Sequence, residues 1–295
     1  MKVAFAMIVF EGDFVLRQCL EQVYPHASQI LIAEGPVTYW QEEGRTTSTD
    51  TTNSILQNFP DPENKIKIVH GQFKGKDEQC NAYIKHLSTE TDFLWMIDSD
   101  EIYKTQDIEA TFNFLKEVSP TSVGIRSCSF FGGFGHYLTG FEQNVDNFLR
   151  IFKVTPGSTW VTHRPPTMGH LKDIDKKHID SEFFLALTGV QIYHYSYTFP
   201  KQVYNKMRYY KAKVSRDNCI DGYFDKIYLP WVTASTEGER KEIEEKYKGV
   251  HEFKPEIRGA CFTRPFEGVH PEAIEKSLPD LKQRFYTELE EVQKK

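Results

Sequence analysis

The sequence predicts an α/β fold with a mostly parallel central sheet flanked by helices, and a helical C-terminal extension. In the first 127 residues, short apolar runs alternate with segments that have helical spacing. Parallel strands need crossover connections of about a dozen residues, and a parallel sheet covered on both faces has strands that are apolar throughout. The length of 295 residues and the hydrophobic content of 39% allow one such core with an extension.

Five apolar, β-rich runs are the expected strands of this sheet. They cover residues 3–10, 29–33, 66–70, 93–98 and 121–127. Four helices are predicted between these strands. The signals are apolar residues at helical spacing, or acidic and N-cap residues at the start of a segment. These expected helices cover residues 14–23, 48–59, 77–87 and 105–118.

The regular alternation ends near residue 128. Gly132, Gly133 and Gly135 lie among aromatic residues and predict a hairpin turn. Further strands are expected at 148–154 and 190–195, further helices at 201–216 and 237–248, an irregular segment at 249–271, and an amphipathic C-terminal helix within 271–295. With no internal repeat and no linker, we expect one domain over residues 1–215 and a helical extension over residues 216–295.

Composition excludes several classes of protein. The 36 Lys and Arg residues against 42 Asp and Glu residues give a net charge of −6, which argues against wholesale binding of nucleic acid. The longest clean apolar run, residues 3–10, is too short to span a membrane, and no signal peptide is visible. Five scattered cysteines with no C-x-x-C pair fit a reducing compartment, so we expect a cytoplasmic protein.

The most informative residues follow the expected fourth strand. Asp98, Asp100 and Glu101 place three carboxylates within four residues, directly after a buried run. Mutual repulsion raises their pKa values unless a cation lies among them, and hard oxygen ligands suit Mg²⁺ or Mn²⁺. The alternative is a solvated strand-to-helix turn with acidic caps.

Seven short motifs follow one another over residues 1–215. They are Ile8-Val9-Phe10-Glu11, residues 30–34, Ser48-Thr49-Asp50-Thr51-Thr52, Gln79-Cys80-Asn81, Asp98-Ser99-Asp100-Glu101, residues 146–152 and His194-Tyr195-Ser196-Tyr197. In this order they resemble the family 2 glycosyltransferases with the GT-A fold, and among these the bacterial lipopolysaccharide-core β-glucosyltransferase group. The resemblance implies a nucleotide-sugar half over residues 1–127 and an acceptor half over residues 128–215.

The resemblance also implies roles for individual residues. It implies a Mn²⁺ or Mg²⁺ site and a nucleoside-diphosphate sugar as donor, with Asp98, Asp100 and His194 as metal ligands. The residues that it places against the donor are Phe10, Glu11, Glu34, Asp50, Gln79, Asn81, Asp98 and Ser99. Asp50 can equally be a plain acid at a helix N-terminus, and His194 a structural histidine.

Two departures from the family pattern affect this assignment. Residues 36–47 are inserted between the second strand and the Ser-Thr-Asp segment, which leaves open whether Glu34 or Asp50 contacts the base. In addition, Thr162-His163-Arg164 stands where the family has Val-His-Glu, so the family's candidate base is missing. An inverting transfer needs a group that takes the acceptor proton. Asp146, His163 and Glu142 are candidates, and Asp146 is favoured because it matches a family motif.

Residues 196–216 contain six basic residues, interleaved with tyrosines, and no acid. One interpretation is a face for an anionic or lipid-linked acceptor and peripheral contact with the inner face of a membrane through residues 197–216. The more common alternative is a solvated amphipathic helix. Trp160 is the tryptophan expected to stack on a sugar, whereas Trp95 is expected in the core.

We therefore expect a metal-dependent transfer of a sugar to a hydroxyl of a glycan or glycolipid, as in polysaccharide biosynthesis. Two other functions remain open on the same fold. One is a sugar-phosphate nucleotidyltransferase, against which the absence of a Gly-rich basic segment after the first strand argues. The other is a non-catalytic carbohydrate-binding protein.

Overall fold

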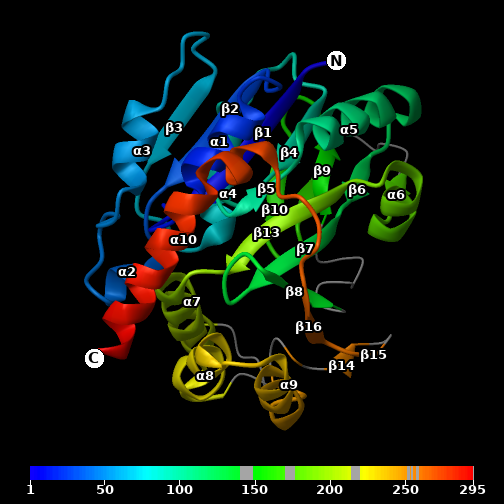
Figure 1. The fold of residues 1–295 in the computed structure, drawn as a ribbon. Coiled ribbons are helices and arrows are strands. Elements are labelled where there is room, and N and C mark those ends of the chain that lie inside the picture. Colours follow the sequence, from blue (N-terminus) through cyan, green and yellow to red (C-terminus); the bar gives the residue numbers. More distant parts are fainter. Residues whose placement is uncertain are drawn as a thin grey trace. The chain divides into compact units, whose positions relative to one another are not determined.

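The structure is a computed structural model that describes residues 1–139, 149–169, 177–213, 220–250, 253, 255–256 and 259–294 (Figure 1). The chain forms two compact units. The first comprises residues 1–126, 144–192 and 271–273, and the second comprises residues 127–143, 193–270 and 274–295. The predicted α/β class and the helical C-terminal segment are confirmed. The functional division at residues 127 and 215 stays a prediction.

The first unit is built on a seven-stranded sheet with the order β12-β6-β9-β4-β1-β2-β3. Its strands are β1 (Val3–Val9), β2 (Gln29–Glu34), β3 (Ile66–His70), β4 (Phe93–Met96), β6 (Ser122–Gly124), β9 (Leu149–Lys153) and β12 (His178–Ile179). The pairs β1–β2, β2–β3, β1–β4 and β12–β6 are parallel, whereas β9 is antiparallel to both β4 and β6. The carboxyl ends of β1 to β4 therefore lie along one edge, where ligands bind in open α/β sheets.

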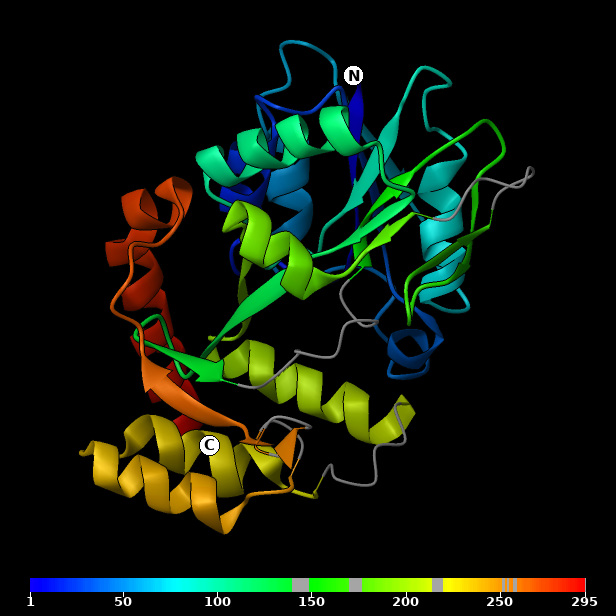
Figure 2. The same cartoon turned by 90° about the vertical axis from the view of Figure 1, so that its right-hand side faces the viewer.

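Helices cover both faces of this sheet. They are α1 (Leu16–Val23), α2 (Thr38–Glu42), α3 (Thr52–Asn58), α4 (Lys76–Ile84), α5 (Thr105–Val118) and α6 (Ser181–Thr188). Figure 2 shows α4, in cyan, on one side of the sheet, and α1 and α5 on the other. This arrangement buries the central strand β1 on both faces, which explains why its sequence is apolar without alternation. Short strands β5 (Glu101–Ile102), β10 (Thr159–Thr162) and β11 (Thr167–Gly169) complete the unit.

Local signals explain most of the element boundaries. Helix α5 has the predicted bounds because Ser119 caps it in the left-handed conformation and Pro120 follows. Helix α3 begins at Thr52 rather than at the predicted residue 48, since residues 48–51 bond to the loop after β1 instead. The inserted segment 36–47 contains α2, which the sequence pattern did not predict.

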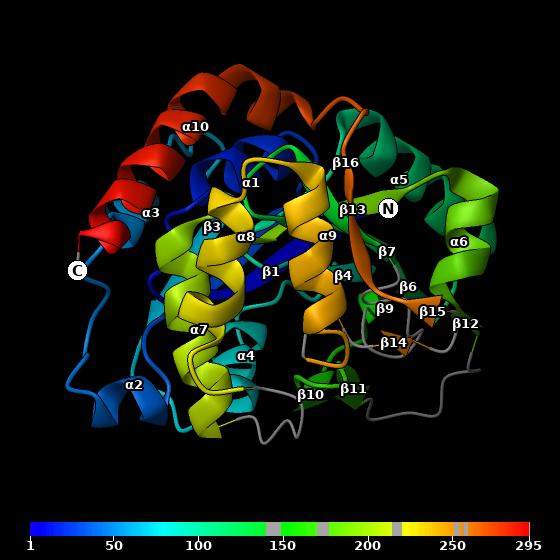
Figure 3. The ribbon, with the colours of Figure 1, turned by 60° about the horizontal axis from the view of Figure 1, so that its bottom comes forward.

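The second unit combines a sheet with helices. Its strands are β7 (Arg126–Phe131), β8 (His136–Thr139), β13 (Gln191–Tyr197), β14 (Pro255–Glu256), β15 (Gly259–Ala260) and β16 (Phe262–Pro265). Strands β7 and β8 form an antiparallel hairpin whose turn contains Gly132, Gly133 and Gly135, as predicted. The helices are α7 (Pro200–Lys213), η2 (Phe224–Tyr228), α8 (Leu229–Thr233), α9 (Glu237–Lys246) and α10 (Glu272–Gln293). Figure 3 shows α7, α8 and α9 side by side.

A buried carboxylate joins three elements of the second unit. Glu244 of α9 is 1% exposed; its Oε1 accepts from the Trp231 indole N–H of α8 at 2.8 Å, and its Oε2 accepts from the Thr263 main-chain N–H of β16 at 3.1 Å. These bonds satisfy a charge that would otherwise be costly to bury. They explain how the irregular segment expected at 249–271 contains an ordered strand.

Within the part of the chain that the structure describes, no helix has both the length and the apolar character needed to span a bilayer.

Candidate active site

The carboxyl ends of β1 to β4 approach one another closely. A Cβ on Gly12, after β1, would lie 2.7 Å from the Ser99 hydroxyl oxygen after β4. A Cβ on Gly35, after β2, would lie 1.8 Å from the main-chain oxygen of Gly71 after β3. Glycine at these two positions therefore allows the four strand ends to form one continuous rim.

A loop containing the Ser-Thr-Asp motif is fastened to the end of β1. Glu11 has a φ of 48° and accepts from the Arg45 guanidinium at 2.5 Å and from the Thr49 hydroxyl at 2.7 Å. Asp13 accepts from the Thr51 hydroxyl at 2.7 Å. The predicted donor residue Glu11 thus holds the loop in place. Its neighbour Phe10 lies with its ring 6.1 Å from that of Trp40 in the inserted segment.

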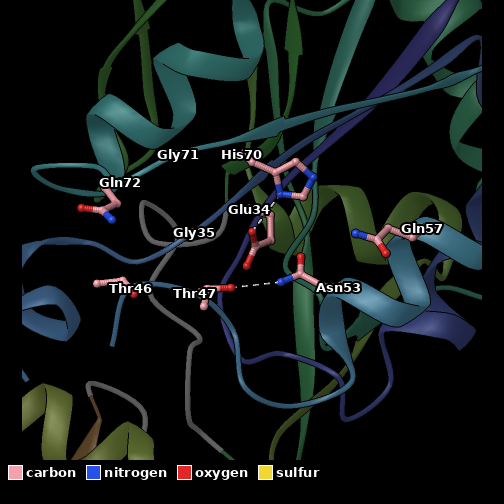
Figure 4. Close-up of a pocket in the computed structure, with 9 residues that line it drawn as sticks. All are labelled: Glu34, Gly35, Thr46, Thr47, Asn53, Gln57, His70, Gly71 and Gln72. Atoms are coloured by element: carbon pink, nitrogen blue, oxygen red, sulfur yellow. Dashed lines mark hydrogen bonds and ion pairs between the residues drawn. The ribbon is translucent and has the colours of Figure 1, made fainter. Parts of the chain in front are cut away.

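A polar pocket of about 470 Å³ lies against this loop and the ends of β2 and β3 (Figure 4). Its lining residues are Glu34, Gly35, Thr46, Thr47, Asn53, Gln57, His70, Gly71 and Gln72. Carboxylate, amide, hydroxyl and imidazole groups dominate this set. Asn53 donates to the Thr47 hydroxyl at 3.5 Å, and its own amide oxygen is buried with no hydrogen-bond partner among the described residues. The pocket can therefore offer hydrogen bonds to a planar polar ligand.

Glu34 is the acid of this pocket. It is 4% exposed; its Oε1 accepts from the Ser48 hydroxyl at 2.7 Å, and its Oε2 lies 3.0 Å from His70 Nδ1. Ser48 in turn accepts from the main-chain N–H of Glu11 at 3.0 Å. These contacts fix the orientation of the carboxylate and leave acceptor lone pairs for a ligand N–H.

Asp50, the other candidate for the base contact, has a different setting. Its side chain accepts from the main-chain N–H groups of Thr52 at 3.0 Å and Asp13 at 3.3 Å. Burial, together with the nearby Asp13 carboxylate, raises its pKa. Asp50 is not among the residues that line the pocket, so the geometry favours Glu34 as the acid that faces a base.

The amides of Gln79 and Asn81 bind main chain. The buried Gln79 donates to the carbonyls of Ala33 at 3.0 Å and Gly35 at 3.1 Å. Asn81 both donates to the carbonyl of Trp160 at 2.9 Å and accepts from its N–H at 3.0 Å. Gln79 therefore supports the end of β2, and Asn81 holds β10 against α4. Their predicted contact with the donor stays a prediction.

The acidic end of β4 contains a buried ion pair. Arg150 of β9 is 2% exposed, and its Nε donates to Glu101 at 2.9 Å while its Nη2 lies 3.3 Å from Asp98 Oδ2. Burial by itself would raise the pKa of Asp98, but the Arg150 guanidinium acts together with His163, Arg164 and Lys76, and these groups hold that pKa well below its usual value. Asp98 is therefore ionised. Its ion pair with the buried Arg150 and the burial of Glu101 argue against the interpretation of this segment as a solvated turn.

The residues at this strand end fit a divalent cation. Asp98, Ser99 and Asp100 are partly exposed and follow one another at the strand end. Carboxylate oxygens are the donors that Mg²⁺ and Mn²⁺ prefer. Glu101 is fully buried and pairs with Arg150. His194, the third predicted ligand, lies buried in β13 of the second unit.

The candidate bases have different outcomes. Asp146 and Glu142 lie outside the described residues. His163 is 4% exposed, and burial, with Lys76 adding to it, lowers its pKa to about 3. Its Nδ1 lies 3.6 Å from the Cys80 thiol, whose pKa burial raises to about 12. The Cys80 thiol therefore occupies the Nδ1 side of the His163 ring.

The expectation for Trp160 is wrong. Its side chain is 3% exposed, and its ring packs edge-to-face with that of Phe152, with the ring centroids 5.2 Å apart. Neither face of the indole is therefore open to a sugar. Trp95 is fully buried, as expected. The other residues that line the pocket were not predicted from the sequence. His70 and Gln72 could have been found by applying the strand-end rule to β3, whereas Asn53 and Gln57 carry no local signal.

Residues 46–176 match the model of the family described as Glycosyl transferase family 2. This match covers less than half of the chain. Together with the α/β sheet and its acidic strand end, it supports the predicted resemblance to sugar-transferring enzymes with the GT-A fold. The match bears out the resemblance to the family 2 glycosyltransferases that the seven motifs predicted. A search of curated proteins gave no match.

Solved structures similar to this chain include TarS 1–349 from S. aureus in complex with UDP. It aligns with 16% identity over 44% of this chain and 36% of that chain, with a TM-score of 0.34. The chain thus spans about a third of that protein's length. Another structure of TarS 1–349 aligns with 13% identity over 85% of this chain and 71% of that chain, with a TM-score of 0.41.

A third similar structure is glucosyl-3-phosphoglycerate synthase from Mycobacterium tuberculosis, solved with Mn²⁺, UDP and glucosyl-3-phosphoglycerate. It aligns with 14% identity over 44% of this chain and 44% of that chain, with a TM-score of 0.31.

Proposed function

We propose that the protein transfers a sugar from a nucleoside diphosphate to a hydroxyl of a glycan or glycolipid acceptor, with inversion and with a divalent cation. One observation carries this proposal. A polar pocket that contains Glu34 and an acidic segment that contains Asp98 and Asp100 lie along the same edge of one parallel sheet. Nucleotide ligands bind at this edge in open α/β sheets.

The donor base would occupy the pocket. Glu34 would accept a hydrogen bond from an N–H group on the edge of the base, because Ser48 and His70 already hold its carboxylate in place. Glu11 and Asp50 would act indirectly, by fixing the loop that forms a wall of the pocket. Phe10 and Ser99 would line the path from the base to the diphosphate.

Asp98 and Asp100 would hold Mn²⁺ or Mg²⁺, and we propose His194 as a further ligand. A cation bound there would offset the negative charge that develops on the leaving diphosphate. Arg150 helps to keep the Asp98 carboxylate ionised, since its positive charge lowers the pKa of Asp98. Asp146 is our proposed base. His163 is less suited to this role, because its Nδ1 faces the Cys80 thiol and its side chain is buried.

The acceptor would bind to the half of the chain after residue 128, and a lipid-linked acceptor remains part of the proposal. We do not extend it to membrane contact through residues 197–216. Lys201 and Lys211 form ion pairs with Glu291 and Asp221, and Lys206 donates to the main-chain oxygen of Ser196. These contacts favour the alternative, in which this segment is an amphipathic helix whose basic side chains bond to other residues of the same protein.

Calorimetry with UDP, GDP, ADP, CMP and dTDP tests the proposal, first with Mn²⁺ or Mg²⁺ and then with EDTA. We expect one diphosphate to bind tightly and EDTA to weaken its binding. Asp100→Asn should reproduce the effect of EDTA, since it removes one charged oxygen ligand. Glu34→Gln should weaken binding with and without the cation, because it changes the base contact only.

Asp280→Asn is the matched control, because Asp280 is an exposed acid on α10. It should bind the nucleotide as the unchanged protein does. If a folded sample binds none of the five nucleotides with either cation, the proposed donor site is wrong.

A further inference from the structure

A charged cluster lies beneath the acidic strand end, formed by Arg150, Glu101 and Asp98. Glu101 is 0% exposed and Arg150 is 2% exposed. The Arg150 Nε donates to both carboxylate oxygens of Glu101, at 3.1 and 2.9 Å, and its Nη2 donates to the Oε1 of that carboxylate as well. The two buried side chains thus satisfy each other's charge.

This pair holds Asp98 at several points. The Arg150 Nη2 lies 3.3 Å from Asp98 Oδ2. The main-chain N–H of Asp98 donates to Glu101 Oε2 at 3.1 Å, and the N–H of Glu101 donates back to the carbonyl of Asp98 at 3.0 Å. The Oδ2 side of the Asp98 carboxylate is therefore held by the buried Arg150, while the Asp98 side chain is still 23% exposed to solvent.

The charges of the cluster also balance in a particular way. Glu101 offsets the charge of Arg150, so the three groups together keep one negative charge, which resides on the partly exposed Asp98. Without Glu101, the charges of Arg150 and Asp98 would cancel, and the attraction of this strand end for a cation would be weaker. A buried ion pair is a poor source of stability, because desolvation of both charges offsets their attraction. A role in orientation explains the pair better than a role in folding alone.

We propose that the buried Arg150–Glu101 pair is a positioning device that orients the Asp98 carboxylate toward the donor nucleotide and its cation. This inference rests on the proposed function. Both side chains are buried, and in this proposal both act through Asp98. The positions are far apart in the sequence, and the pairing of β9 beside β4 brings them together.

Arg150→Lys and Glu101→Gln test the inference with little change in volume. Thermal unfolding reports the fold, and calorimetry reports the binding of Mn²⁺ alone and of the five nucleotides used above. We expect both variants to fold and to bind Mn²⁺ or nucleotide about tenfold or more weakly, the loss typical of groups that orient a ligand-binding side chain. Wild-type affinity in a folded Arg150→Lys protein would overturn the inference.

A charge swap separates positioning from stability. Glu101→Arg combined with Arg150→Glu keeps the buried pair but places a carboxylate beside Asp98. We expect the swap to recover melting temperature relative to either single change, without recovering binding. Recovery of both the melting temperature and the binding would show that the pair only stabilises the fold, and would overturn the inference.

A structure of the unchanged protein with Mn²⁺ and the bound nucleotide tests the inference even if the variants fail to fold. Asp98 should keep its Oδ2 on Arg150 while its other oxygen faces the ligand. A carboxylate turned away from Arg150 in that complex would contradict the inference. If the unchanged protein binds neither Mn²⁺ nor any nucleotide, the proposed function and this inference both fail. If it binds them and Arg150→Lys binds equally well, only the inference fails.

Discussion

At the scale of single residues, Gly35 illustrates how the site depends on close approach of main chain. Its φ of 145° lies outside the range that other residues favour, and a Cβ there would lie 1.8 Å from the Gly71 carbonyl oxygen. The N–H of Gly71 also donates to the carbonyl of Glu34 at 3.0 Å. Any side chain at position 35 must therefore separate the ends of β2 and β3.

We expect Gly35→Ala to lower the free energy of unfolding by about 3 kcal/mol or more, through backbone strain and this clash together. Gly44→Ala is the control, since Gly44 also has a positive φ, of 77°, but no atom lies within 4 Å of its added Cβ. That change should cost only about 1 kcal/mol. Urea unfolding measures both, and equal losses would show that the clash is relieved at little cost.

The residue scale also shows what the sequence could predict about the site. Glu34, Asp98 and Asp100 were predicted because a local rule, that strand ends carry ligands, needs only the strand boundaries. The partners of these residues were not predicted. Arg150 reaches Asp98 only through the antiparallel pairing of β9 with β4, and His70 reaches Glu34 only through the pairing of β3 with β2. Contacts of this kind depend on register between distant segments.

At the scale of elements, the bounds of α5 follow from local sequence signals, but a buried acid in its first turn lowers the stability of the folded state at neutral pH. Its bounds were predicted in full because a clear start and Pro120 enclose it. In its first turn, Asp107 is 9% exposed, and burial raises its pKa to about 6, with Lys104 partly opposing and Glu272 adding to the effect. Helix α2 was not predicted, and α3 was predicted to begin at residue 48 instead of Thr52, because tertiary hydrogen bonds of residues 48–51 decide where α3 begins.

We expect Asp107→Asn to stabilise the protein at neutral pH by on the order of 1 kcal/mol. The folded state holds the Asp107 proton more tightly than the unfolded state, so stability falls as the pH rises from the ordinary pKa of 3.8 toward about 6. Asparagine carries no charge and removes this loss. The variant should therefore match the unchanged protein near pH 4 and exceed it above pH 6.

Melting temperatures measured between about pH 4 and pH 8 check this expectation. Asp280→Asn, on the exposed side of α10, should leave the profile unchanged. A destabilised Asp107→Asn protein at pH 7 would mean that the Asp107 charge favours the N-terminus of α5 by more than its burial costs.

At the scale of the whole molecule, the order of strands makes the first unit depend on distant segments of the chain. Strand β9 lies between β4 and β6 in the sheet, although residues 127–143 of the second unit precede it in the sequence. The alternation of strands and helices predicted the parallel core over residues 1–118, but it could not predict that a later strand enters between two earlier ones. The predicted nucleotide-sugar half, residues 1–127, therefore lacks a central strand of its own sheet.

We accordingly expect a fragment of residues 1–126 to show no cooperative unfolding transition. It would leave the fully buried Leu94 and Trp95 of β4 without the β9 partner, and the buried Glu101 without Arg150. A fragment of residues 1–192 restores β9 and β12 and should unfold cooperatively. Circular dichroism during urea unfolding distinguishes the two. Cooperative unfolding of residues 1–126 would show that β1 to β4 form a stable sheet without β9, and that the first half of the chain is a folding unit of its own.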